Sequence, residues 1–153
     1  MTAPVSTPEA ANSDVDLSAI NGAQQEIVDE FDLFDDWTDR YRYIIDLGRE
    51  LDQLPEDARP DGALIRGCQS RVWLTSGEEG GALTFRAATD AAIVAGLIAL
   101  VLRVYNARSP AEILGTSPWF IEKIGLAEHL SPTRSNGLHA MLGRIQEIAG
   151  RAA

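Results

Sequence analysis

The chain has 153 residues, 45% of them hydrophobic and 24% charged, which is enough for one globular domain with a sizeable core. Its net charge of −10, with no basic stripe, argues against nucleic acid as a partner. A single cysteine excludes a disulfide within the chain, and the longest apolar run, residues 91–102, is shorter than the roughly 20 residues of a membrane span.

Residues 1–17 mix Pro, Ser, Thr, Ala and Asp without periodicity, which predicts a disordered tail before a single domain over residues 18–153. This start lacks the basic residues and apolar run of a signal peptide, so we expect a cytoplasmic protein. Apolar residues then recur at helical spacing from Ser18 to Leu54, and Asp35-Asp36 suits a helix start, so two helices joined near residues 34–36 are expected.

The charge of the chain is concentrated in its first third. Residues 1–60 carry fifteen Asp or Glu against four Arg, whereas residues 61–153 carry eight acidic residues against nine basic ones. Such a composition is typical of a solvated helical cover, with docking to a basic partner as the alternative. The core and any site are therefore expected in the C-terminal two-thirds.

After residue 62 the hydrophobic pattern changes to that of short strands. Residues 63–66, 71–75 and 82–87 are strand candidates, and short links between them predict an antiparallel meander. Residues 77–81 form a Gly-rich turn between the second and third strands, and residues 67–70 form the loop between the first and second. The order of elements predicts an α+β fold with a small three-stranded antiparallel sheet covered by helices.

Helices are expected over most of the remaining chain. Thr89 or Asp90 can N-cap a helix that runs to about Asn106, and its apolar character on nearly every side predicts a central position against the sheet. Three Ser-Pro pairs predict later helix starts, at Ser109, Ser117 and Ser131. The last helix carries an apolar stripe at helical spacing, made of Leu138, Met141, Leu142, Ile145 and Ile148.

The sequence gives little support for a phosphate-binding loop, a metal site or a cysteine-protease triad. The Gly-rich turn is followed by a strand, so it is not a phosphate-binding loop, and Cys68, His129 and His139 are too few for a usual zinc or iron–sulfur site. His129 is read as a helix-end or site residue, and His139 as a surface residue. A Cys68–His129–Asn136 protease triad is formally possible, but the local signatures of such proteases are absent.

Cys68 remains as the candidate nucleophile. A lone thiol can attack sulfur and carry it away as a persulfide, because no second thiol is present to resolve the adduct as a disulfide. Arg66 and Arg71 flank the loop with positive charge that favours a thiolate. The residues alone leave open the alternative of an inert buried thiol.

Four ordered blocks of sequence resemble the SufE family of sulfur-acceptor proteins, which work with PLP-dependent cysteine desulfurases in iron–sulfur cluster assembly. The blocks are GCQS with VW at residues 67–73, DAAIVAGLIA at 90–99, LSPTRSNGLHAM at 130–141 and, more weakly, YIIDLG at 43–48. Together they cover about residues 30–150.

The resemblance implies a domain like that of the iron–sulfur scaffold proteins, with an acceptor cysteine on a loop at one tip of the sheet. Cys68 would take persulfide sulfur from the desulfurase, stimulate that enzyme, and deliver sulfur to a downstream iron–sulfur scaffold. No cofactor or metal is expected in the chain itself, since PLP belongs to the desulfurase, and the protein would act as a partner of that enzyme. Further residues match the family blocks and are candidates to line the site or contact the partner: Gly67, Gln69, Ser70, Trp73, Asp90, His129 and Arg134.

Each candidate has a structural alternative, such as a helix cap for Asp90, a first-turn charge for Arg134 and a turn former for Ser70. Trp73 and the start of the Asp90 helix are plausible walls of a shelter for the thiol. The alternatives for the whole protein are a paralogous carrier for another acceptor pathway and a single-cysteine redox-responsive interaction protein. A cluster scaffold is disfavoured because three cysteine ligands are missing.

Overall fold

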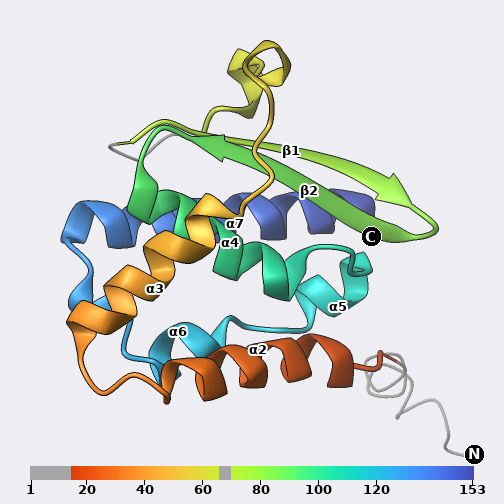
Figure 1. The fold of residues 1–153 in the computed structure, drawn as a ribbon. Helices are drawn as coiled ribbons and strands as arrows, with labels where there is room; N and C mark the ends of the chain where they lie inside the picture. The colour runs from red at the N-terminus through yellow and green to blue at the C-terminus, as the bar shows by residue number, and fades with distance from the viewer. Residues whose placement is uncertain (1–14, 66–69) are drawn as a thin grey trace, which may run out of the picture.

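The computed structural model describes residues 15–65 and 70–153. Its elements are α2 (Ser18–Phe31), α3 (Trp37–Arg49), the short 3-10 turns η2 (Glu56–Ala58) and η3 (Asp61–Ala63), β1 (Val72–Glu79), β2 (Ala82–Thr89), α4 (Ala92–Tyr105), α5 (Pro110–Leu114), α6 (Trp119–Lys123), η4 (Ala127–His129) and α7 (Pro132–Ala152). Figure 1 shows the hairpin on one side of the molecule, α4 beneath it, and α2 with α6 on the far side. The predicted α+β class, with helices packed on an antiparallel sheet, is confirmed; most of the predicted tail lies outside the described residues.

The described sheet has two strands, so the predicted third strand is wrong. β1 pairs with β2 from Val72 opposite Thr89 to Glu79 opposite Ala82. Of the expected first strand, the described part makes one bridge, Leu64 with Trp73, and one further hydrogen bond, from the Ile65 N–H to the Val72 carbonyl at 2.8 Å. The η3 turn extends to Ala63, which leaves too little extended chain for a ladder.

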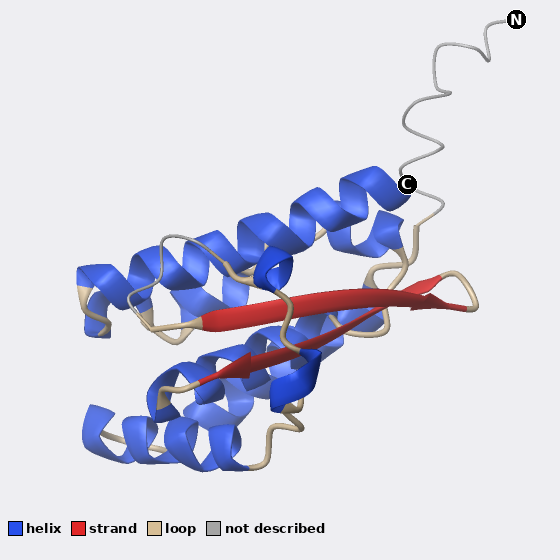
Figure 2. Cartoon of the chain, turned by 90° about the horizontal axis from the view of Figure 1, so that it is seen from above, coloured by secondary structure: helices blue, strands red, loops and turns tan. Residues whose placement is uncertain are grey.

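The two faces of the hairpin are unlike. Val72 and Leu74 point inward and are buried, whereas Trp73 and Thr75 alternate onto the outer face. Figure 2 looks down on this outer face, and among the described helical segments only η2 and η3 lie above it. The inner face therefore supplies the core, and the outer face is covered in part, since Ala88 opposite Trp73 is fully buried.

The first two helices confirm the break predicted near residues 34–36. Asp36 N-caps α3, because its side chain accepts a hydrogen bond from the Asp39 N–H at 2.9 Å. A bidentate pair joins α2 to α4, with the Arg103 guanidinium donating to the two Glu30 carboxylate oxygens at 2.8 and 2.7 Å. The Tyr43 hydroxyl of α3 donates to the same carboxylate, so three helices share one polar contact.

α4 is the predicted central helix, but its expected cap is wrong. The N-cap residue is Ala91, and no side chain caps the helix. Asp90 instead forms an ion pair with Arg71, and the buried Thr89 hydroxyl accepts a long hydrogen bond of 3.4 Å from the Ala91 N–H. The backbone remains extended through Ala91, so neither predicted residue reaches the capping position.

A helix follows each of the three Ser-Pro pairs, and in two of them the serine is the N-cap. Ser109 forms a capping box with Glu112, and the Ser131 hydroxyl accepts from the Arg134 N–H at 3.3 Å. Ser117 caps nothing, because Pro118 occupies the N-cap position and the helix begins at Trp119. The third helix therefore follows its Ser-Pro pair as predicted, but Ser117 does not cap it.

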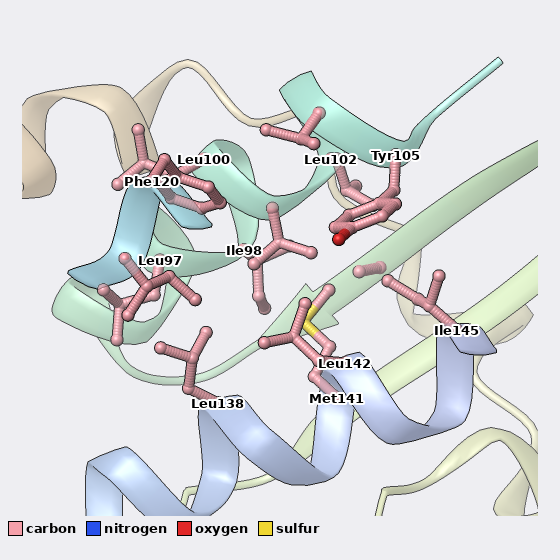
Figure 3. Packing of buried hydrophobic residues seen from close by; sticks show 14 of the residues in the cluster. Leu97, Ile98, Leu100, Leu102, Tyr105, Phe120, Leu138, Met141, Leu142 and Ile145 are labelled. Carbon is pink, nitrogen blue, oxygen red and sulfur yellow. The ribbon is translucent and has the colours of Figure 1, made fainter. Parts of the chain in front are cut away.

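The core lies between the inner face of the sheet and the helices. Figure 3 shows side chains of α7 packed against those of α4, and the predicted stripe residues Leu138, Met141, Leu142 and Ile145 are all buried, with Ile148 partly so. No described helix has the length and apolarity that crossing a membrane requires.

Candidate functional site

The predicted loop Gly67, Cys68 and Gln69 lies outside the described residues, but both of its ends are described. Ile65 and Val72 are hydrogen-bonded to each other, so the chain leaves and returns at the same end of the sheet. Ser70, the last candidate of the GCQS block, is half-buried and lies just before β1. The surroundings of Ser70 therefore define the environment next to the loop.

A small cavity of about 80 Å³ opens beside Ser70, between β1, α4 and α7. Its apolar walls come from all three elements, and Figure 3 shows Leu97 and Ile98 on one side facing Leu138 and Met141 on the other. Its polar groups come from Ser70 and the first turn of α7. The lining residues are Ser70, Val72, Val94, Leu97, Ile98, Thr133, Arg134, Gly137, Leu138 and Met141.

The start of α7 places the polar side of this cavity. Ser131 caps the helix and Pro132 occupies its first turn, which fixes where Thr133 and Arg134 lie. Arg134 is exposed and lies in the first turn of α7, the position that its structural alternative describes. Its side chain also lines the cavity. The cavity combines apolar walls with one cation and two hydroxyl groups at its edge.

Trp73 and Asp90 do not line this cavity but belong to a cluster on the outer face of the sheet. The Arg71 guanidinium lies 5.4 Å from the Trp73 ring centroid and donates to the Asp90 carboxylate at 3.3 Å. The Arg59 guanidinium lies 5.2 Å from the same ring. The sequence suggested Trp73 and the start of α4 as walls of a shelter for the thiol. The start of α4 lines the cavity through Val94, whereas Trp73 lies on the other face of the sheet.

His129 packs elsewhere. Its ring stacks on Trp37 with centroids 4.0 Å apart and planes 14° apart, and its Nδ1 lies 3.0 Å from the Gly125 carbonyl oxygen. It therefore joins η4 to the start of α3 and is not among the cavity residues. His139 is exposed on α7, as expected.

Sequence reasoning missed two contributors. Arg59 lies in a connection interpreted only as polar, and nothing in the sequence indicates its contact with Trp73. Met141 belongs to the apolar stripe of the last helix and also lines the cavity. Its position three residues after Leu138 places both side chains on the same face of α7, which is the signal that could have indicated this. Within the described ranges, no three His, Cys, Asp or Glu side chains gather as a metal site, and the metal-free carrier stays a prediction.

A family model and two relatives among known proteins agree on one family. A model described as "SufE: Fe-S metabolism associated domain" matches residues 25–149. A protein of Rhizobium meliloti (strain 1021) named as an uncharacterized SufE-like protein is 44% identical over 132 residues, covering 82% of this chain and 94% of the relative. A Rhizobium etli protein with the same description is 46% identical over 129 residues, covering 81% and 87%. The solution structure of a hypothetical protein from Thermus thermophilus matches with a TM-score of 0.70 over 85% of this chain and 95% of that one; at 21% identity this likeness concerns the fold alone.

Proposed function

The chain belongs to the SufE family, which is associated with iron–sulfur metabolism, and from this premise we propose that it is a sulfur acceptor and carrier. Cys68 takes sulfane sulfur from a cysteine desulfurase, stimulates that enzyme by emptying its persulfide, and passes the sulfur on for iron–sulfur cluster assembly. The observation that carries the proposal is the apolar cavity beside Ser70, two residues along the chain from the only cysteine.

The transfer step needs one nucleophile and no external oxidant. The Cys68 thiolate attacks the terminal sulfur of the desulfurase persulfide, a new S–S bond forms on Cys68, and the S–S bond on the desulfurase breaks. The desulfurase cysteine leaves as a thiolate, so electrons and sulfur atoms balance. Delivery to the next acceptor repeats the exchange in the opposite direction.

The cavity suits the needs of a carried persulfide. A persulfide is lost when another thiol or an oxidant reaches it, so its lifetime depends on restricted access. Leu97, Leu138 and Met141 provide apolar walls beside Ser70, the first described residue after the loop. Arg134 at the edge forms no ion pair with any described residue and supplies positive charge for an anionic persulfide or for an acidic group of the partner.

Mass spectrometry of the intact protein tests this function. Purified protein is incubated with each PLP-dependent cysteine desulfurase of its host and L-cysteine, and we expect a mass gain of about one sulfur atom per transferred persulfide, reversed by reductant. Cys68→Ser is the matched control and should gain nothing. A wild-type protein that neither gains sulfur nor changes the rate of any of these desulfurases would refute the proposal.

The same samples separate the alternatives. A redox-responsive protein would gain oxygen on peroxide treatment without any desulfurase, as sulfenic acid forms on the thiol. A cluster scaffold would instead develop iron-dependent colour. A paralogous carrier would gain sulfur but fail to support cluster assembly on a scaffold protein.

A further inference from the structure

The two edges of the hairpin differ in how their backbone groups are satisfied. Along β2, the Leu83 N–H donates to the Arg108 carbonyl at 2.7 Å, and the Leu83 carbonyl accepts from the Ala107 N–H at 2.8 Å. Further along, the Phe85 N–H donates to the Asn106 side-chain oxygen at 2.7 Å. The chain that follows α4 therefore covers this edge, as natural sheets commonly require.

The register shows which backbone groups of β1 face away from β2. Ser76 lies opposite Phe85, and Glu78 lies opposite Leu83. Residues directly opposite each other in an antiparallel pair either bond to each other or both point outward. Because the backbone groups of Leu83 and Phe85 point outward along β2, those of Ser76 and Glu78 point outward along β1.

These outward groups of Ser76 and Glu78 have no hydrogen-bond partner within residues 15–65 and 70–153. On this side of the sheet, the Leu64–Trp73 bridge and the hydrogen bond of Ile65 cover only the start of β1. From Ser76 to its end the strand is exposed, and Figures 1 and 2 both show the hairpin end projecting past the described helices. Unpaired N–H and carbonyl groups thus remain, in the spacing of a strand.

We propose that an extended segment of the cysteine desulfurase adds to β1 as a further strand, at Ser76 and Glu78. The proposal rests on the proposed function and names how the partner is held. An added strand satisfies the outward N–H and carbonyl groups with main-chain hydrogen bonds, the mode of recognition that an open sheet edge offers. The segment lies in line with Leu64 and Ile65, so it completes the third strand that the described chain supplies at one end only.

The open edge and the Cys68 loop fit within one interface. Ser76 follows Val72 by four residues, and Val72 binds Ile65, the last described residue before the loop. At about 3.3 Å per residue, the edge begins roughly 13 Å from that end of the loop. A standard interface covers about 800 Å² on each partner, a patch roughly 30 Å across. A desulfurase that reaches Cys68 can therefore pair with the edge at the same time.

A second copy of this chain is a poorer occupant of the edge. Each copy carries a net charge of −10, so two copies repel each other. Glu78 and Glu79 are also exposed on the part of the strand that would have to pair, and charged residues on an edge strand oppose pairing between identical copies. A desulfurase segment without acidic side chains avoids this repulsion.

Hydrogen exchange of individual amides, read by NMR, tests strand addition directly. The carrier is measured alone and with the host desulfurase that loads wild-type Cys68 by mass. In the free protein we expect fast exchange at Ser76 and Glu78 and slow exchange at Thr75 and Gly77, whose N–H groups face β2. With the desulfurase, exchange at Ser76 and Glu78 should slow by at least about tenfold, because both amides become hydrogen-bonded.

Proline at the edge removes one of the outward donors. Ser76→Pro lacks this N–H but leaves the hydrogen bonds to β2 in place, since an edge strand tolerates proline where the N–H faces solvent. Ser76→Thr is the matched control, because it keeps the N–H and suits a strand. For Ser76→Pro we expect the carrier concentration at the half-maximal desulfurase rate to rise about tenfold with the maximal rate little changed, and for Ser76→Thr a change within about twofold.

Thermal unfolding and slow exchange at Thr75 and Gly77 show whether Ser76→Pro folds, and where it does not, exchange in the wild type decides. The inference alone fails if the desulfurase loads Cys68 while Ser76 and Glu78 keep their free exchange rates, or if a folded Ser76→Pro binds within about twofold of Ser76→Thr.

Two other results overturn it by assigning the edge elsewhere. Protection of the Ser76 and Glu78 amides in the carrier alone, together with a dimer's mass in light scattering, assigns the edge to a second copy. Protection by an iron–sulfur scaffold protein but not by the desulfurase assigns it to sulfur delivery. If no host desulfurase loads wild-type Cys68, the proposed function and the inference fail together, and the mass measurement identifies that case.

Discussion

Gly96 offers the sharpest test of how the fold supports the site. α3 and α4 cross with Gly48 and Gly96 against each other, and a Cβ added at Gly96 would lie 2.0 Å from the Ile44 carbonyl oxygen and 2.6 Å from its carbonyl carbon. These are backbone atoms, so no rotamer change relieves the overlap. Gly96→Ala must push the two helices apart.

The expected cost is large for a single methyl group. Inserting a methylene into a packed core costs about 1–3 kcal/mol when side chains can adjust, and here they cannot, so we expect at least about 3 kcal/mol. For a domain of this size each kcal/mol lowers the midpoint of thermal unfolding by about 2–4 °C, which predicts a fall of roughly 6–12 °C. α4 also supplies Val94, Leu97 and Ile98 to the cavity, so sulfur loading of Cys68 should weaken as well.

Thermal and chemical denaturation of Gly96→Ala, Gly22→Ala and Gly143→Ala measure this effect. The last two are matched controls within helices, because a Cβ there meets nothing within 4 Å. Both should be stabilised by about 0.5–1 kcal/mol, since alanine has the higher helix propensity. The close-packing argument fails if Gly96→Ala unfolds within about 1 kcal/mol of wild type.

Three further predictions concern single contacts. Glu30→Gln removes the carboxylate that Arg103 holds and should lower the free energy of unfolding at pH 7 by about 1–2 kcal/mol, reduced by partial exposure. The hydrogen bond from Arg103 lowers the pKa of Glu30 below its ordinary 4.5, so this stabilisation is present above pH 4.5 and is lost as the pH falls through the folded-state pKa. Urea denaturation at pH 3 to 7 should therefore show the stabilities of wild type and variant converging in acid. A difference that stays constant with pH would contradict the assignment. Ser131→Ala should cost about 1 kcal/mol in the same melts and Ser117→Ala almost nothing, since only Ser131 caps a helix; equal losses would refute the cap. Val94→Phe fills the cavity, so loaded Cys68 should lose its sulfur to dithiothreitol several-fold faster by mass, and an unchanged rate would count against the shelter.

Hydrophobic periodicity predicted the helices well because each buries one face. Ile20, Ile27 and Phe31 lie on the buried side of α2, and the uniformly apolar run became the central helix α4. The break at Asp36 was predictable because a capping side chain acts within three residues of the chain. Interactions between residues close together in the chain can therefore be predicted from the sequence.

Features that depend on distant segments were not predictable. Strand propensity over residues 63–66 could not reveal that η3 ends at Ala63 and leaves only the Leu64–Trp73 bridge. Identical Ser-Pro pairs behave differently because the Trp119 side chain bonds to Asn21 of α2, and its backbone N–H to the Ser117 carbonyl, as the chain enters α6. The cavity depends on how closely α4 and α7 pack, and no periodicity in the sequence encodes that distance. Two of the SufE-like blocks, residues 90–99 and 130–141, nevertheless contain the parts of both helices that line the cavity.

In the proposed function, selectivity must arise from docking rather than from the sulfur chemistry. A persulfide transfers its terminal sulfur to any thiolate that reaches it, and attack at the inner sulfur instead releases hydrosulfide and forms a disulfide. A second thiol in the chain would cause that loss, and Cys68 has none. An apolar cavity restricts access to all acceptors alike, so it protects the sulfur without choosing its destination. The choice therefore falls to the surfaces around the loop, which must distinguish one partner from another.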